Sequence, residues 1–132
     1  MFEKLLNKQI AKQEKVLEKW LTKHDKENPF PNDKVKISEN ISYLDDNKFH
    51  LMDIYQPYNN EKILPIIINI HGGGFLLGKK EVNKLYCAEL AQKGYIDFCV
   101  EYPLSPKAKI IDILNDLIIA INKINEIAID YN

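Results

Sequence analysis

Three consecutive glycines at positions 72–74 lie between His71 and Phe75, directly after an apolar stretch at 63–70. A buried strand that ends in glycines can turn bare backbone N–H groups outward, because glycine has no Cβ to block a ligand and takes positive φ freely. Such N–H groups stabilise the negative charge that develops on an acyl oxygen during ester or amide cleavage. The run is therefore a candidate acyl-transfer site, although a simple turn between a strand and a helix would also use glycines.

Acyl transfer through a hydroxyl also needs a nucleophile with an adjacent base. The serines are Ser38, Ser42 and Ser105, and none of them lies in a Gly-x-Ser-x-Gly sequence. Ser105 stands next to a proline, which is typical of a turn residue. The other histidines, His24 and His50, fall in a predicted helix and a predicted strand, and we expect both at the surface. The sequence therefore offers no candidate nucleophile.

A phosphate-binding loop is the competing interpretation of the same glycines. Gly73, Gly78 and Lys79 fit the first seven positions of G-x-x-x-x-G-K-[ST], but the eighth residue is Lys80, so the hydroxyl that would bind Mg²⁺ is missing. Residues 75–77 are also bulky and apolar, where a phosphate cradle needs small residues. Nucleotide binding is therefore the weaker hypothesis.

The composition indicates one domain: 132 residues, of which 45% are hydrophobic and 28% charged. The net charge of -1 and the absence of Arg predict neither a nucleic-acid partner nor a membrane partner. We expect Cys87 and Cys99 to be buried free thiols in a reducing compartment, although they could form one disulfide. No secretory signal and no apolar run long enough to span a bilayer are visible, so we predict a cytoplasmic protein.

The N-terminal residues, 2–24, are expected to form an amphipathic helix that ends before Pro29. The apolar stripe of this helix consists of Leu6, Ile10, Leu17 and Trp20. Packing of this stripe on the body of the protein is the simplest interpretation. A lid over a site and a short coiled-coil contact are the alternatives.

Alternating apolar and polar residues predict a β-hairpin over 34–55, with a break in its first strand, a turn at 45–48 and a second strand at 49–55. A loop at 57–60 follows. The nearly continuous apolar run at 63–70 predicts a strand that is covered on both faces.

The second half of the chain alternates helix and strand. A helix is predicted over 80–93, with Val82, Tyr86 and Leu90 on one side and a stop at Gly94. A buried strand at 95–102 and a strongly apolar helix at 110–128 follow. Strands that alternate with helices indicate an α/β fold with a mostly parallel sheet, here entered through the hairpin.

Four short motifs in a fixed order carry a family resemblance over residues 43–132. They are Met52-Asp53-Ile54-Tyr55-Gln56-Pro57, the strand and glycines of 68–75, Glu101-Tyr102-Pro103-Leu104-Ser105-Pro106, and Asp116 with Ala120. They resemble L-D-V-Y-x-P, H-G-G-G-W/F, n-Y-R-L-a-P and the Asp and Ala of the next helix in α/β-hydrolases. The chain is thus similar to the N-terminal half of the esterase/lipase superfamily, in its hormone-sensitive-lipase and carboxylesterase-like branch.

This resemblance implies that the N–H groups of Gly73 and Gly74 form an oxyanion hole, and it implies neither a metal nor a cofactor. The residues expected to support the loop or to line the acyl pocket are His71, Gly72, Phe75 and Leu76. In the superfamily the nucleophile, the acid and the catalytic histidine follow later in the chain, and this sequence stops before them. We therefore expect a chain that is close to inert alone.

The expected organisation is an N-terminal helix at 1–28 and a partial hydrolase domain at 33–132, with the first four strands and two helices. Its final helix should pack on the sheet face opposite the helix at 80–93. The edge of the strand at 63–70 should lack a partner, which favours a complementary chain or self-association. The implied function is the N-terminal part of a carboxylic-ester hydrolase that acts on a small acyl ester once completed. The alternative is a non-catalytic remnant or interaction module.

Overall fold

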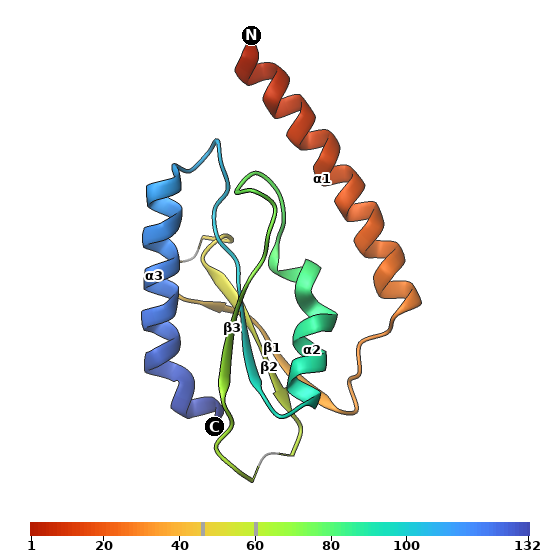
Figure 1. Ribbon diagram of the computed structural model, residues 1–132, viewed down its shortest axis with the longest axis vertical. Helices are drawn as coiled ribbons and strands as arrows, with labels where there is room; N and C mark the ends of the chain where they lie inside the picture. Colours follow the sequence, from red (N-terminus) through yellow and green to blue (C-terminus); the bar gives the residue numbers. More distant parts are fainter. Residues whose placement is uncertain (46, 60) are drawn as a thin grey trace.

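The computed structural model describes residues 1–45, 47–59 and 61–132. A four-stranded sheet lies between two helices, and a long N-terminal helix projects past them (Figure 1). In chain order the elements are α1 (Phe2–Glu27), β1 (Val35–Ser42), β2 (Leu51–Pro57), β3 (Ile66–Ile70), the 3-10 helix η1 (Lys80–Asn83), α2 (Lys84–Gln92), β4 (Ile96–Val100), α3 (Ile110–Ile127) and the 3-10 helix η2 (Ala128–Tyr131). The predicted turn at 45–48 and loop at 57–60 include Asp46 and Asn60, which lie outside the described residues.

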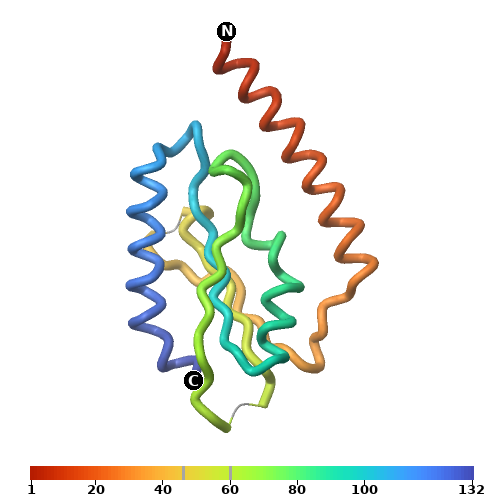
Figure 2. Tube along the Cα trace, in the orientation of Figure 1, coloured from red at the N-terminus to blue at the C-terminus, as the bar shows by residue number. Residues whose placement is uncertain are grey.

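The strand order is β1-β2-β4-β3, with antiparallel pairing from β1 to β2 and from β2 to β4. β3 pairs with β4 in parallel, and the two run side by side in Figure 2. Ile70 is the register partner of Val100, so both strands end at the same edge of the sheet. The predicted α/β fold with a hairpin at its entrance is confirmed, and the sheet is mixed.

Side chains of β4 alternate between two hydrophobic layers. Phe98 and its neighbours on the same face pack with Ala120 and Ile124 of α3. Cys99 lies on the other face with Cys87 of α2 and Tyr55. The predicted placement of the two helices on opposite faces is confirmed, and Cys87 and Cys99 are buried free thiols as expected.

The outer strands differ from the sequence expectation in two details. The break in the first strand is a β-bulge at which Asn40 takes a φ of 59°, a left-handed conformation that Asn tolerates better than most residues. β3 begins only at Ile66, after Pro65. Its first four residues are half-buried and Ile70 is exposed, because β3 has one neighbouring strand among those described. The expectation of a strand covered on both faces was wrong.

Two helices differ from the predicted inward faces, α2 in its main buried residues and α1 at one position. α2 buries its small residues Cys87, Ala88 and Ala91, while Tyr86 is exposed, because only small side chains fit where the helix approaches the sheet closely. In α1, Leu21 is buried and Trp20 is exposed. The predicted inward position of Trp20 was therefore wrong, whereas the other members of that stripe are half-buried.

α3 buries one narrow face through Ile113, Ala120 and Ile124. Much of its remaining apolar surface is open; the exposed members are Ile110, Ile111, Leu114, Ile118 and Ile121. In the described ranges, no helix is both long and apolar enough to cross a membrane.

Candidate functional site

The glycine run forms a loop at the sheet edge where β3 and β4 end. The carbonyl of Gly73 accepts hydrogen bonds from the N–H groups of Leu76 and Leu77, both at 3.1 Å, and this closes a tight turn. The three glycines are exposed. Within the described part of the chain, the N–H groups of Gly73 and Gly74 donate to no acceptor, so they are available to an external oxygen.

The backbone of this loop explains why it needs glycine. Gly73 has a φ of 128°, and a Cβ there would lie 1.8 Å from the carbonyl oxygen of Leu77. Gly74 has a φ of 62°, but a Cβ at Gly74 would have no neighbour within 4 Å. Gly72 is equally open and lacks a positive φ. The space above the loop at 72 and 74 is therefore empty, whereas position 73 is enclosed by the turn itself.

His71 lies beneath the loop and is buried. Its Nε2 lies 2.8 Å from the Oε1 atom of Glu101, and its Nδ1 lies 2.8 Å from the carbonyl oxygen of Gly72. The ring stacks on Tyr102 with centroids 4.2 Å apart, and the Tyr102 hydroxyl donates to the His71 carbonyl at 2.7 Å. Both ring nitrogens face protein acceptors, so His71 presents no free nitrogen to the open side of the loop.

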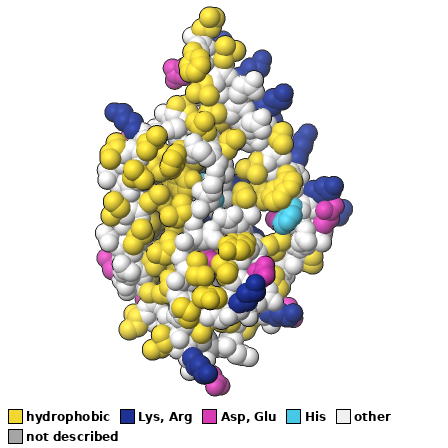
Figure 3. Space-filling model, in the orientation of Figure 1, with side chains coloured by type: hydrophobic (Ala, Val, Ile, Leu, Met, Phe, Trp, Pro, Cys, Tyr) yellow, Lys and Arg dark blue, Asp and Glu magenta, His cyan; other side chains and the backbone are white. Residues whose placement is uncertain are grey.

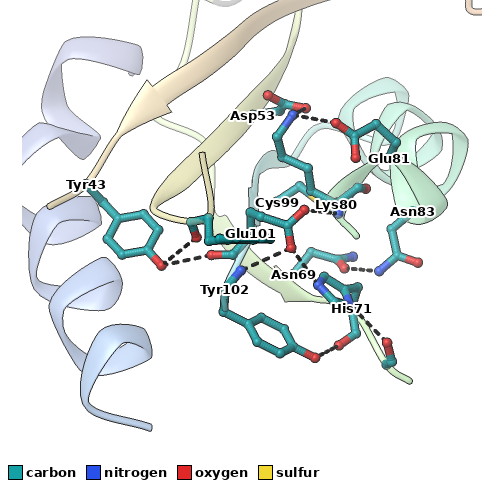
Figure 4. A network of polar contacts seen from close by, with 12 residues as sticks. Tyr43, Asp53, Asn69, His71, Lys80, Glu81, Asn83, Cys99, Glu101 and Tyr102 are labelled. Atoms are coloured by element: carbon teal, nitrogen blue, oxygen red, sulfur yellow. Dashed lines mark hydrogen bonds and ion pairs between the residues drawn. The ribbon is translucent and has the colours of Figure 1, made fainter. Parts of the chain in front are cut away.

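Glu101 connects this histidine to the next element (Figure 4). Its carboxylate also accepts the N–H of Lys80 at 3.2 Å and that of Tyr102 at 3.1 Å, while its carbonyl accepts the hydroxyl of Tyr43 at 2.9 Å. Glu101 begins one of the four motifs but was not predicted as a site residue. The available signal was a carboxylate at the end of an otherwise apolar strand, which is rarely buried without partners.

Lys80 is a second buried charge behind the loop. Its ammonium lies 2.7 Å from Asp53 and 2.9 Å from Glu81. Burial opposes the charge on Lys80, but the hydrogen bonds and charges of Asp53 and Glu81 outweigh burial and raise its pKa. Asp53 in turn accepts the N–H of Asn40 at 2.8 Å, so the bulge of β1 belongs to the same network.

The phosphate-binding alternative loses support from these contacts. Lys79 pairs with Glu18 of α1 at 2.5 Å, and Lys80 pairs with Asp53. Both lysines therefore have carboxylate partners instead of converging on the exposed glycine N–H groups.

A cavity of about 610 Å³ separates the first half of α1 from the loop after β4. Its walls are mainly apolar; the lining residues are Glu3, Asn7, Ile10, Ala11, Glu14, Asn47, Phe49, Leu76, Pro103, Leu104, Ser105, Pro106, Lys107 and Ala108. Leu76 brings the glycine loop to this cavity. Phe75 instead packs edge-on against Tyr102, and its carbonyl accepts the N–H of Ser105 at 2.8 Å.

The remaining candidates lie elsewhere. Ser105 is a turn residue as expected, with its hydroxyl bonded to the Ala108 carbonyl at 3.0 Å. His50 is buried between Asp45, at 2.7 Å, and Asp116, at 3.2 Å, so its expected surface position was wrong. These contacts join the hairpin turn to α3. Among the described residues, no group of three or more His, Cys, Asp or Glu side chains could hold a metal ion.

Residues 52–132 match the BD-FAE family. Over 81 residues the chain is 30% identical to isoprenylcysteine alpha-carbonyl methylesterase ICME of Arabidopsis thaliana, an alignment that covers 61% of this chain and 19% of the plant protein. Esterase B from Lactobacillus rhamnosis has the same fold, with a TM-score of 0.90 at 19% identity over 98% of this chain and 42% of that one. A bacterial heroin esterase gives a TM-score of 0.70 at 25% identity over 95% of this chain and 38% of that one.

The chain thus spans less than half the length of each of these relatives. The family match covers more than half of the chain, from β2 through α3. The fold of the solved esterases covers α1 as well. The chain therefore belongs to the BD-FAE family of α/β-hydrolase esterases.

Proposed function

We propose that this chain provides the oxyanion-binding half of a carboxylic-ester hydrolase that works through a serine acyl-enzyme. One observation carries the proposal: the N–H groups of Gly73 and Gly74 are exposed and donate to no described residue, while the loop that holds them is fixed from beneath by His71 and Glu101. A rigid pair of unsatisfied donors is what an oxyanion hole requires, because it loses no energy to reorganisation when the charge develops.

In the proposed mechanism, a serine hydroxyl attacks the ester carbonyl, and the carbonyl oxygen becomes negatively charged while it accepts the N–H groups of Gly73 and Gly74. Collapse of the tetrahedral intermediate expels the alcohol, and water then hydrolyses the acyl-enzyme. One oxyanion donor is typically worth about 10²–10³ in kcat. The attacking serine, its histidine and the acid would come from residues outside this sequence, which contains no Gly-x-Ser-x-Gly. Alone, the chain should be close to inert.

The proposed substrate is a small ester. The cavity beside Leu76 is mainly apolar, which suits an acyl chain or a short alcohol. Support also comes from the relatives, since the plant protein is a methylesterase and esterase B was crystallised with a tributyrin phosphonate. The buried free thiols of Cys87 and Cys99 are consistent with a cytoplasmic location, which we include in the proposal.

The test compares two glycines that are equally open in the structure. The chain is mixed with the residues encoded downstream of codon 132, and hydrolysis of p-nitrophenyl butyrate is measured for Gly74→Ala and Gly72→Ala. Neither new Cβ meets an atom within 4 Å, but Gly74→Ala also carries the strain of a positive φ, about 1–2 kcal/mol, so circular dichroism checks that both variants fold. Gly74→Ala places a methyl group where the acyl oxygen must approach, and kcat/KM should fall about 10²-fold. Gly72→Ala should leave it nearly unchanged.

Equal losses in the two variants would contradict the proposed site, and so would turnover that neither substitution affects. A downstream sequence that lacks a Gly-x-Ser-x-Gly within a few dozen codons would favour the second candidate.

The second candidate function is a non-catalytic interaction module, and a different observation favours it. β3 lies at the edge of the sheet, and the outer side of α3 exposes several large apolar residues, Ile111 and Ile118 among them. A complementary chain or a second copy could cover both. This candidate predicts a stable complex without any ester hydrolysis.

A further inference from the structure

The charges of α1 are divided between its two sides. Seven of the eighteen lysines of the chain recur every three or four residues along this helix, and all seven are exposed; they are Lys4, Lys8, Lys12, Lys15, Lys19, Lys23 and Lys26. Residues with this spacing share one face of a helix. Among the described residues, only Lys23 of this set forms an ion pair, with Glu27 at 3.8 Å.

Three of the five acidic residues of α1 are turned toward the body of the protein. Glu3 and Glu14 line the cavity beneath the helix, and Glu18 pairs with Lys79. The nearly neutral net charge of the chain therefore conceals a positive outer side of α1. Figure 3 shows dark blue lysine side chains along the outer edge of this helix.

An apolar strip runs beside the lysines. Phe2, Leu5, Val16 and Trp20 are all exposed, from 80% for Phe2 to 47% for Trp20. Their spacing places them on one side of the helix, between the lysine face and the inward residues such as Leu21, with Gln9 and Gln13 in the same strip. Figure 3 shows hydrophobic side chains along this exposed side of α1.

Lysines on one face and Trp, Phe and Leu on the adjacent face are typical of helices that lie in the surface plane of a membrane. We propose that α1 binds the surface of bilayers that contain anionic phospholipid, with its lysines against the headgroups and its apolar strip between them. The strip is short and interrupted by glutamines, so most of the attraction is electrostatic. Binding to lipid would leave the cavity beneath α1 open, because the lipid-binding side of the helix faces away from it.

Other occupants fit this surface less well. A second copy of α1 would bring two lysine faces close together beside the apolar strip, which like-charge repulsion opposes. Nucleic acid would use the lysines but leave Phe2 and Val16 exposed to water. The proposal is independent of the ester chemistry, since it uses no residue of the glycine loop.

Trp20 is the only tryptophan of the chain and lies within the strip, so its fluorescence reports directly on the contact. The full chain is mixed with phosphatidylcholine vesicles that contain or lack phosphatidylserine, and co-sedimentation and Trp emission are recorded. We expect binding and a blue shift with the anionic vesicles only. Raising the salt from about 0.05 M to about 0.5 M should release the protein, because it shortens the Debye length severalfold.

A matched pair of triple variants separates the effect of the α1 lysines from the effect of the net charge of the chain. Lys8→Gln/Lys12→Gln/Lys15→Gln should lower the partition coefficient about a hundredfold, from about 1 kcal/mol for each lysine near an anionic surface. Lys34→Gln/Lys36→Gln/Lys109→Gln removes the same charge from exposed positions on the body and should change it little. Far-UV circular dichroism checks that both variants keep their helix content.

Several results would overturn the proposal. One is equal binding to neutral and anionic vesicles, and another is an equal loss in the two triple variants. A Trp20 emission that does not shift with vesicles would mean that the strip does not enter the lipid. Binding to duplex DNA as strong as binding to the anionic vesicles would assign the lysines to polyanions in general.

Discussion

The Nε2 atom of His71 lies 2.8 Å from the Oε1 atom of Glu101, and this contact joins the end of β3 to the end of β4. Parallel pairing produces it, because Ile70 and Val100 are register partners and the two side chains follow directly after them. The second carboxylate oxygen of Glu101 accepts the N–H of Lys80, at the start of η1. One side chain thus holds both ends of the glycine loop, as Figure 4 shows.

Replacing Glu101 with Ala should destabilise the protein. The change removes the acceptor of three N–H groups, those of His71 Nε2, Lys80 and Tyr102. Buried donors without a partner cost about 1–3 kcal/mol each, so we expect the free energy of unfolding to fall by about 3 kcal/mol. Urea unfolding followed by circular dichroism measures it. Glu101→Gln keeps one acceptor oxygen and should lose less stability. A Glu101→Ala variant with the wild-type free energy of unfolding would show that these hydrogen bonds do not stabilise the folded state.

Gly78, like Gly73, should be difficult to replace. It has a φ of 106°, and a Cβ there would lie 2.3 Å from the carbonyl oxygen of Gly72 and 2.5 Å from Nδ1 of His71. Gly94 provides the control, since its φ is 91° but a Cβ would meet nothing within 4 Å. Gly94→Ala should cost only the strain of positive φ, about 1–2 kcal/mol. Gly78→Ala should cost clearly more in the same unfolding experiment, and equal costs would mean that the loop relaxes freely.

Asp97 should make the protein less stable as the pH rises. Its carboxyl group is fully buried on β4, and neither oxygen has a hydrogen-bond partner among the described residues. Burial raises its pKa from 3.8 to about 6, although nearby Cys87 and Asn69 favour the charged form. The folded state therefore favours the protonated acid. The stabilisation from the protonated Asp97 is complete below about pH 4. It is lost between about pH 4 and pH 6, where the carboxyl group ionises in the folded state.

The variant Asp97→Asn keeps the shape of the side chain and removes this ionisation. We expect it to raise the free energy of unfolding by about 3 kcal/mol at pH 7.5, from a pKa shift of about two units, and to have little effect at pH 4. Urea titrations at the two pH values measure the difference. A variant whose effect is the same at both pH values would mean that Asp97 titrates normally.

The order of elements was predictable because it depends on local patterns. Alternation of polar and apolar residues located the hairpin, and the handedness of crossovers placed α2 and α3 on opposite faces. The inward face of α2 was not predictable in the same way. Large residues such as Tyr86 dominate an apolar pattern, whereas the close approach of helix and sheet selects Cys87, Ala88 and Ala91.

The candidate site was likewise predictable only in part. The glycine loop is contiguous in sequence, so its position was visible directly. Its support is not contiguous, since Glu101 contacts a residue 30 positions away and Lys80 contacts one 27 positions away. Only the register of β3, β4 and β2 brings these charges together, and that register could not be predicted from the sequence patterns alone.

The buried pair of Lys80 and Asp53 should show strong coupling in a double-mutant cycle. Lys80→Met leaves the Asp53 carboxylate buried without its counter-charge, and the loss should be about 3–5 kcal/mol. Lys80→Met/Asp53→Asn removes both charges and should recover most of that loss. The pair of Lys93 and Glu89 has the same 2.7 Å separation but is exposed on both sides, so Lys93→Met should change little. Additive effects at Lys80 and Asp53 in thermal unfolding would contradict this account.

The open edge of β3 and the outer side of α3 should make the isolated chain associate. Ile111 and Ile118 are 60% and 56% exposed on this side of α3, and exposed apolar surface beside an unpaired edge strand favours pairing with another chain. Sedimentation velocity at several concentrations should therefore show species larger than the 15.4 kDa monomer. Ile111→Glu/Ile118→Glu should shift the distribution toward the monomer, whereas Ile129→Glu, also at an exposed position, should not. A chain that is monomeric at every concentration and unfolds cooperatively would show that this apolar surface is stable in water. The proposal of a complementary chain would then lose its physical basis.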